Sequence, residues 1–154
     1  MSKSTRLPKT SARRAPENLA ILLREPFRAL SDELMARLVA RGYPQVRFAH
    51  GNVFQFLDDD GTRVSVLAER AGMTKQAMAQ LVTHLEQHGY VERVADPRDR
   101  RAKLVRATDR GREVFAVARE LVEEVDARLG ERLGEAKLRQ LRLLLQELDA
   151  ALWA

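Results

Sequence analysis

Polar side chains recur along residues 76–87 in a pattern that could hydrogen-bond to nucleic-acid bases. Gln76, Gln80, Thr83 and Gln87 are spaced by three or four residues, so a helix would carry them on one face. A glutamine amide can pair with the edge of adenine through two hydrogen bonds, and a threonine can contact a base or a thymine methyl group. The row has no acidic residue to repel phosphate. It therefore predicts a base-reading surface, and the alternative is a polar, solvated face without a partner.

A basic loop follows this row. Residues 96–101 read Asp-Pro-Arg-Asp-Arg-Arg, which favours a turn, and a lysine comes soon after. Guanidinium groups suit contacts to phosphate and can also enter a minor groove. Asp96 or Asp99 could instead pair with one of the arginines and hold the loop in shape. The predicted contacts of the loop are Arg98, Arg100, Arg101 and Lys103.

Two short helices joined by a tight turn would present the polar row. Apolar residues recur at i, i+3, i+4 and i+7 over 64–71, and Gly72 can supply the left-handed position that ends this helix. Thr74 is the predicted N-cap of the second helix, which ends at Gly89. The inward residues are Val64, Leu67, Ala68 and Ala71 in the first helix, and Met78, Leu81, Val82 and Leu85 in the second. Such a pair is a helix-turn-helix, whose second helix can enter a DNA major groove.

A β-hairpin would carry the basic loop. Residues 90–94 read Tyr-Val-Glu-Arg-Val and look like a strand, and residues 102–106, Ala-Lys-Leu-Val-Arg, look like its partner. Pro97 cannot donate a ladder hydrogen bond, so a continuous strand across the loop is excluded. The loop is therefore predicted to be the tip of a two-stranded hairpin.

Other reactive side chains do not form a recognisable catalytic or metal site. His84 and His88 have the i, i+4 spacing that can share a metal, but no third ligand is evident, and a phosphate or base contact is favoured for His84. His50 could line an effector pocket, although an ordinary hydrogen-bonded residue is favoured. Residues 58–60 are three adjacent aspartates without the spacing of a calcium loop. The sequence therefore predicts no enzyme, no cofactor and no metal.

Composition indicates a globular protein of one main domain. The chain has 154 residues, of which 45% are apolar and 32% charged. It has no cysteine, so disulfides and thiol-based sensing are excluded. No apolar run is long enough to span a membrane, and residues 1–6 do not resemble a secretory signal. We expect a cytoplasmic protein with no membrane partner.

Positive charge is concentrated in two segments. Residues 1–16 contain five basic residues and no acidic one, and residues 93–112 contain eight basic and three acidic residues. This distribution favours contact with a polyanion. The first segment is predicted to be a disordered basic arm, which would either add phosphate attraction or only keep the protein soluble.

Leucine-rich helices are predicted on both sides of the helix-turn-helix. The first covers about 17–41, with a kink or a junction of two helices at Pro26, and a second covers about 44–57. After the hairpin, Thr108 would cap a long helix to about Leu129, and a final helix would follow a weak region at 130–134. These helices have more apolar surface than the central unit can cover, so we expect a two-fold dimer. The predicted interface residues are Leu19, Leu22, Leu138, Leu141, Leu145, Leu148, Leu152 and Trp153.

Residues 64–111 resemble the winged helix-turn-helix core of the MarR (multiple-antibiotic-resistance regulator) family. The similarity is carried by residues 67–76, by residues 85–93, and most specifically by the Asp-x-Arg-Asp-x-Arg pattern at 96–101 with a later Thr-x-x-Gly at 108–111. Ala107 departs from the family, which usually has leucine before the threonine. The resemblance implies a homodimeric transcription factor, usually a repressor, often released from DNA by a small ligand bound between its dimer helices and its DNA-binding lobe.

The expected fold is mainly α with a small β-hairpin wing. Residues 17–154 would form one domain, with dimerisation helices at 17–43 and 113–154 and a winged helix-turn-helix lobe at 44–112. The expected partner is a roughly palindromic operator in double-stranded DNA, with half-sites about 10 base pairs apart. Alternatives are a non-specific or architectural DNA-binding protein, and a small-molecule-binding protein on an incidental winged fold. The predicted recognition-helix contacts are Thr74, Lys75, Gln76, Gln80, Thr83 and His84.

Overall fold

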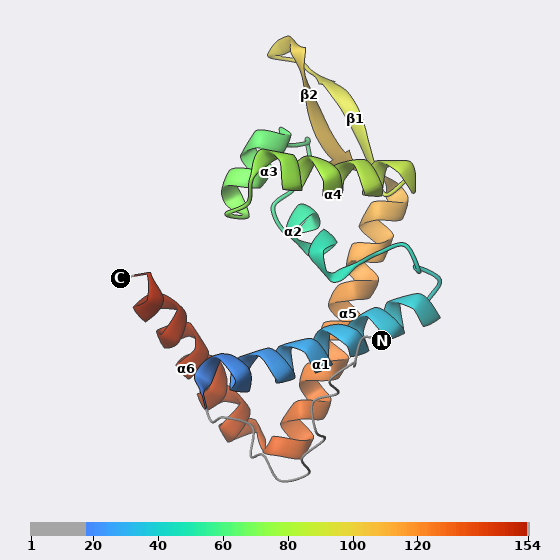
Figure 1. Cartoon of the computed structure of the whole chain (residues 1–154). Helices are drawn as coiled ribbons and strands as arrows, with labels where there is room; N and C mark the ends of the chain where they lie inside the picture. The colour runs from blue at the N-terminus through green and yellow to red at the C-terminus, as the bar shows by residue number, and fades with distance from the viewer. Residues whose placement is uncertain (1–17, 154) are drawn as a thin grey trace, which may run out of the picture. The chain divides into compact units, whose positions relative to one another are not determined.

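The computed structural model describes residues 18–153, and the predicted arm at 1–16 lies outside them. The chain divides between Glu33 and Leu34 into two units. The structure confirms a mainly helical fold with one two-stranded antiparallel sheet (Figure 1). In chain order the elements are α1 (Leu19–Ala40), the 3-10 turn η1 (Phe48–His50), α2 (Gly51–Phe54), α3 (Val64–Arg70), α4 (Lys75–Gln87), β1 (Val91–Asp96), β2 (Asp99–Ala107), α5 (Asp109–Leu133) and α6 (Glu135–Leu152).

The first helix is continuous through its proline. Helix α1 includes Pro26 in its interior, so the prediction of two helices meeting there is wrong. The backbone angle that proline imposes is itself helical, although the ring removes one amide hydrogen bond and crowds the carbonyl of the preceding turn. One turn later the Ser31 hydroxyl donates to the Phe27 carbonyl at 2.8 Å, a side-chain bond within the helix.

The second predicted helix, at about 44–57, is much shorter. Only η1 and α2 are helical in this region. Arg47 is extended, and its backbone N–H donates to His50 Nδ1 at 2.9 Å, which makes Phe48 the first residue of the turn. After α2, the Asp58 backbone N–H donates to Thr62 Oγ1 at 2.9 Å and stabilises a turn. Side-chain hydrogen bonds at both ends therefore replace helical ones.

The predicted helix-turn-helix is confirmed in α3 and α4. Gly72 between them has a φ of +61°, a left-handed conformation that favours glycine. Leu67 and Ala68 of α3 are buried against the inward stripe of α4. Thr74 caps α4 as predicted, because its side chain accepts the Ala77 backbone N–H at 3.2 Å.

The hairpin strands are longer than predicted. The register pairs Val91 with Ala107 and Asp96 with Asp99, with an irregularity next to Ala95. Strand β2 begins at Asp99, so Arg100 and Arg101 lie on the strand rather than in the loop, and only the turn at Pro97 separates β1 from β2. The strands predicted from the sequence are too short because the cross-strand partner, not residue type, decides where pairing stops.

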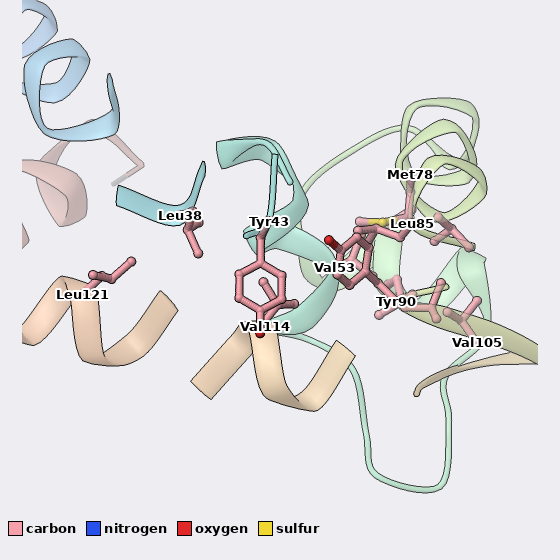
Figure 2. Packing of buried hydrophobic residues seen from close by; sticks show 13 residues of the cluster. Leu38, Tyr43, Val53, Met78, Leu85, Tyr90, Val105, Val114 and Leu121 are labelled. Atoms are coloured by element: carbon pink, nitrogen blue, oxygen red, sulfur yellow. The ribbon is translucent and has the colours of Figure 1, made fainter. Parts of the chain in front are cut away.

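A single apolar core holds the helix-turn-helix on α5 and on the end of α1. Figure 2 shows buried side chains from Leu38 of α1 through Tyr90 to Val105 of β2. The hydroxyl of Tyr90 is satisfied inside this core, because it donates to Gln45 Oε1 at 3.1 Å. Helix α4 is thereby anchored on a rigid base.

The Thr-x-x-Gly pattern marks the close approach of α5 to the hairpin. Thr108 caps α5 by accepting the Gly111 backbone N–H at 3.1 Å, as predicted, and donates its hydroxyl to the Gly89 carbonyl at 2.6 Å. A Cβ on Gly111 would lie 1.9 Å from the Tyr90 carbonyl oxygen. Only glycine fits at this position.

Helix α5 continues past its predicted end. It runs through Gly130 to Leu133, and the chain turns at Gly134, whose φ is +90°. The missing Cβ of Gly130 leaves room for the Glu135 carboxylate, which would otherwise clash with it. The glycine at 130 thus serves packing between α5 and α6 and does not end the helix.

Candidate nucleic-acid interface

Helix α4 turns its predicted base-reading row toward solvent. Gln76, Gln80, Thr83 and Gln87 are all exposed. The opposite face is fixed in the core, where Met78, Val82 and Leu85 are completely buried (Figure 2 shows Met78 and Leu85). The helix therefore presents amides that can donate and accept, on a backbone that packing holds in place.

The hairpin, referred to below as the wing, extends beyond α3 and α4 (Figure 1). All four predicted basic contacts on it are exposed: Arg98, Arg100, Arg101 and Lys103. Its turn is stabilised from within, because Asp96 Oδ1 accepts the Arg98 backbone N–H at 2.9 Å and Asp99 Oδ1 accepts that of Arg101 at 3.1 Å. The aspartates thus bind the backbone of the basic residues and leave the guanidinium groups outside.

The two wing aspartates pair with Arg63, a residue that was not predicted to belong to this site. Arg63 lies at the start of α3, and its guanidinium contacts Asp96 Oδ2 at 2.8 Å through Nε and 2.6 Å through Nη2. Asp99 Oδ2 lies 3.7 Å from the same Nη2. The expected pairing with a tip arginine side chain is therefore corrected. Residues 33 positions apart leave no local signal of their contact.

Asp96 is nearly fully buried, and its pKa is lowered. The largest cause is the hydrogen bond from the Arg98 backbone N–H, followed by the Arg63 side chain, and together they outweigh the cost of burial. The carboxylate stays ionised at neutral pH. It fixes the wing turn to the helix-turn-helix, because one of its oxygens accepts two charge-assisted hydrogen bonds from Arg63.

A second unpredicted arginine links the base of the wing to α4. Arg93 of β1 places Nε 3.1 Å from Glu86 Oε2 and Nη2 3.5 Å from Thr83 Oγ1. Both partners belong to α4. The wing and the helix are thus joined at Thr83, which is predicted to read bases, and the charge of Arg93 is paired with that of Glu86.

His84 lies on the inward side of the predicted DNA surface. Its Nε2 is 2.9 Å from the Gln45 carbonyl oxygen, and its ring is stacked on the ring of His50. A carbonyl only accepts, so this nitrogen carries the proton and is not available to DNA. The structure therefore gives His84 an intramolecular role in place of the predicted phosphate or base contact. Lys75 and Thr74, by contrast, are exposed.

A cavity of about 450 Å³ lies between the end of α1, the η1–α2 segment and α5. Its walls are mostly apolar, with Leu38, Phe54 and Leu121 among them. Two arginines and one glutamate, Arg47, Arg119 and Glu123, also line it, and all three are exposed. The cavity could take an apolar ligand that carries an anionic group.

Six of the eight predicted dimer residues are exposed in the single chain. Leu138 is only 6% exposed and is already covered within the chain, so it is corrected to a core residue. Leu148 is half-buried. The remaining predicted interface residues are exposed: Leu19, Leu22, Leu141, Leu145, Leu152 and Trp153, the last at 83%.

Within residues 18–153, no group of three or more metal-ligating side chains converges. No helix in the same part of the chain is long and apolar enough to cross a membrane.

Comparison with known proteins identifies the family. The MarR family model matches residues 45–102. The transcriptional regulator HosA of Escherichia coli O111:H- is 31% identical over 94 residues, covering 60% of this chain and 70% of HosA.

Solved structures agree with this assignment. CouR from Rhodococcus jostii RHA1 bound to p-coumaroyl-CoA is 27% identical, with a TM-score of 0.67 over 88% of this chain and 95% of CouR. The repressor CouR on a 23-mer DNA duplex is 25% identical, with a TM-score of 0.70 over 86% of this chain and 93% of that one. The S. aureus MepR–DNA complex shares the fold, with a TM-score of 0.73 at 18% identity, over 87% and 98% of the two chains. The chain belongs to the MarR family and is a winged helix-turn-helix transcription regulator, not an enzyme.

Proposed function

We propose that this regulator binds a specific, roughly palindromic operator as a symmetric homodimer and represses transcription until a small ligand releases it. The main support is the exposed row of amides on α4 beside the arginine-bearing wing. The repressor role is extended from CouR, which is described as a transcriptional repressor.

In this proposal some residues of the interface read bases and the others position the protein on the duplex. Gln76, Gln80 and Thr83 read base edges in the major groove, since amides and hydroxyls can discriminate bases there. The remaining contacts hold phosphates or minor-groove edges and set the register of the protein on the duplex. They are Thr74, Lys75, Arg98, Arg100, Arg101 and Lys103. His84 is left out because its ring is engaged with Gln45.

The dimer would bring two recognition helices to half-sites about 10 base pairs apart. Support comes from the exposed apolar side chains on α1 and α6, which include Leu22, Leu141, Leu145 and Trp153. Isolated apolar residues on a surface are normal, but a helix that exposes leucine repeatedly calls for a covering partner. A second copy of the chain is the simplest such partner.

The ligand would occupy the cavity between α1, η1–α2 and α5. Its apolar walls suit an aromatic or aliphatic body, and Arg47 and Arg119 suit a carboxylate or phosphate. CouR, which has the same fold, binds p-coumaroyl-CoA. We therefore propose an apolar anion, such as an aromatic acid or its coenzyme A thioester. A differential affinity of about 1–3 kcal/mol between two conformations is enough for a usable response.

The decisive experiment selects bound duplexes from a random DNA pool and then compares the affinity for the selected duplex with that for a scrambled one. A palindromic consensus with a large affinity ratio is expected. A ratio near one would favour a non-specific or architectural protein. Ligand binding without any DNA binding would favour a small-molecule-binding protein on a winged fold.

Effector control is tested on the selected operator. Operator affinity and melting temperature are measured with p-coumarate and p-coumaroyl-CoA, in the natural chain and in Arg119→Gln. A ligand that weakens operator binding in the natural chain, and less so in the variant, is expected. If neither compound changes affinity or melting temperature, this class of effector is wrong.

A further inference from the structure

Glu86 is the only acidic residue of α4, and two features of its position make a negative charge unfavourable there. It occupies the last turn of α4, beside the negative end of the helix dipole. It also follows Thr83 by three residues, so its half-buried side chain flanks the exposed row that is predicted to read bases. An ionised carboxylate at this place would repel the phosphates of a bound duplex.

Arg93 of β1 neutralises this carboxylate. Its Nε lies 3.1 Å from Glu86 Oε2, and its Nη2 lies 3.5 Å from Thr83 Oγ1. Because both acceptors belong to α4, the guanidinium is held along that helix rather than extended into solvent. The Arg93 side chain is 29% exposed and that of Glu86 is 38% exposed, so the ion pair lies at the surface without being fully solvated.

The ion pair lies at the junction of α4 and the wing, because β1 follows α4 in the chain and packs against it (Figure 1). In the proposed complex α4 enters a major groove, and the wing contacts phosphates or the neighbouring minor groove. A strand of phosphates separates the two grooves, so it would cross this junction. The carboxylate of Glu86 would then lie close to phosphate, with the charge of Arg93 to offset it.

A second ion pair on the wing provides a comparison. Arg106 and Glu92 join the two strands of the same hairpin, with Nη2 2.7 Å from Oε1. In the hydrogen bonds and ion pairs formed by residues 18–153, neither of these side chains contacts α4. Loss of Arg106 would therefore remove one positive charge from the wing without changing the surroundings of Glu86.

We propose that Arg93 is a positioning residue for DNA binding, which shields the phosphate strand from Glu86 and so allows α4 to enter the major groove. The inference rests on the sequence-specific binding proposed above. Arg93 acts through Glu86, while the basic residues farther along the wing hold phosphates themselves. The effect is larger on the operator than on other DNA, because α4 approaches the duplex most closely when its polar row reads bases.

The test measures the affinity of the full chain for its selected operator and for a scrambled duplex, by fluorescence anisotropy at one salt concentration. Arg93→Gln should weaken operator binding about tenfold and binding to the scrambled duplex less than about threefold. Arg106→Gln removes the same charge and should weaken both by less than about threefold. Glu86→Gln in the Arg93→Gln background removes the unpaired carboxylate and should restore operator affinity to within about threefold of that of the natural chain.

Two outcomes overturn the proposal. One is an operator loss in Arg93→Gln that is no greater than in Arg106→Gln. The other is failure of Glu86→Gln to restore binding, which would make Arg93 a direct phosphate contact.

A further variant keeps the test valid if Arg93→Gln does not fold, which thermal unfolding will show. Glu86→Gln alone retains Arg93 and should bind the operator at least as tightly as the natural chain does. A loss of more than about threefold in this variant also overturns the proposal. The affinity ratio of the natural chain tests the proposed function separately, since it depends on no substitution.

Discussion

Gln80 is near the middle of the exposed row on α4, and its predicted role is to pair with a base. Gln80→Ala should weaken binding to the selected operator by about 1–3 kcal/mol and leave scrambled DNA nearly unaffected. The measurement is fluorescence anisotropy on both duplexes. Gln140→Ala is the matched control, because Gln140 is exposed on α6, outside the predicted DNA surface. Equal losses on both duplexes would remove Gln80 from the base-reading set.

His50 should make the stability of the protein depend on pH. The pKa of His50 is about 4 in the folded chain against an ordinary value of 6.5, so the unfolded chain binds the proton more readily. The stabilisation is therefore complete above pH 6.5 and is lost as pH falls toward 4, by ~3 kcal/mol in total. Urea unfolding at a series of pH values measures this loss. His50→Gln should lose less stability than the natural chain over that range, and identical pH profiles would contradict the assignment.

At the scale of the element, the start of α4 depends on its cap. Thr74→Ala removes the acceptor of the Ala77 N–H and should lower the free energy of unfolding by about 1 kcal/mol. Gln76→Ala is the control, since it truncates an exposed polar side chain in the first turn of the same helix without touching the cap. Thermal unfolding compares the two variants. A larger loss in Gln76→Ala would mean that the cap is not what stabilises the start of α4.

The wing is anchored by Arg63, and its loss should release the turn. Arg63→Ala would leave the Asp96 carboxylate with only its backbone hydrogen bond, so amide hydrogen exchange at residues 96–101 should speed up. Arg63→Lys keeps the charge but loses the pair of guanidinium hydrogen bonds to Asp96, and should give an intermediate rate. Because the pKa of Asp96 is lowered in the folded chain, the anchor contributes stability above its ordinary value of 3.8 and loses it as pH falls below. If amide exchange in Arg63→Ala is as slow as in the natural chain, the hydrogen bonds within the turn are enough to stabilise it.

At the scale of the whole molecule, the proposed dimer depends on the exposed leucines of α6. Leu141→Asp with Leu145→Asp should shift the protein toward monomer in sedimentation experiments and reduce operator affinity, because two half-sites would no longer be bound together. Gln146→Asp adds the same kind of charge to this helix outside the leucine stripe and should leave the dimer intact. If the double variant remains dimeric, the interface lies elsewhere.

The local chain determined the parts of this protein that rest on short-range patterns. The stripes of α3 and α4, the caps at Thr74 and Thr108, the left-handed turn at Gly72 and the basic hairpin were all predicted and are confirmed. The stripes and the caps depend on contacts within about four residues, and the turn depends on one backbone conformation. The hairpin pairs residues as far apart as Val91 and Ala107, so residue type located the hairpin but not the ends of its strands.

Tertiary contacts decided the rest, because they join residues with no local relation. Arg63 meets Asp96 across 33 residues, and His84 meets Gln45 across 39, which turns a predicted DNA contact inward. The bond from Arg47 to His50 shortens a predicted helix, and packing inside one chain buries Leu138. A sequence pattern records which face of a helix is apolar or polar. Which distant group meets that face depends on how the folded chain brings the elements together.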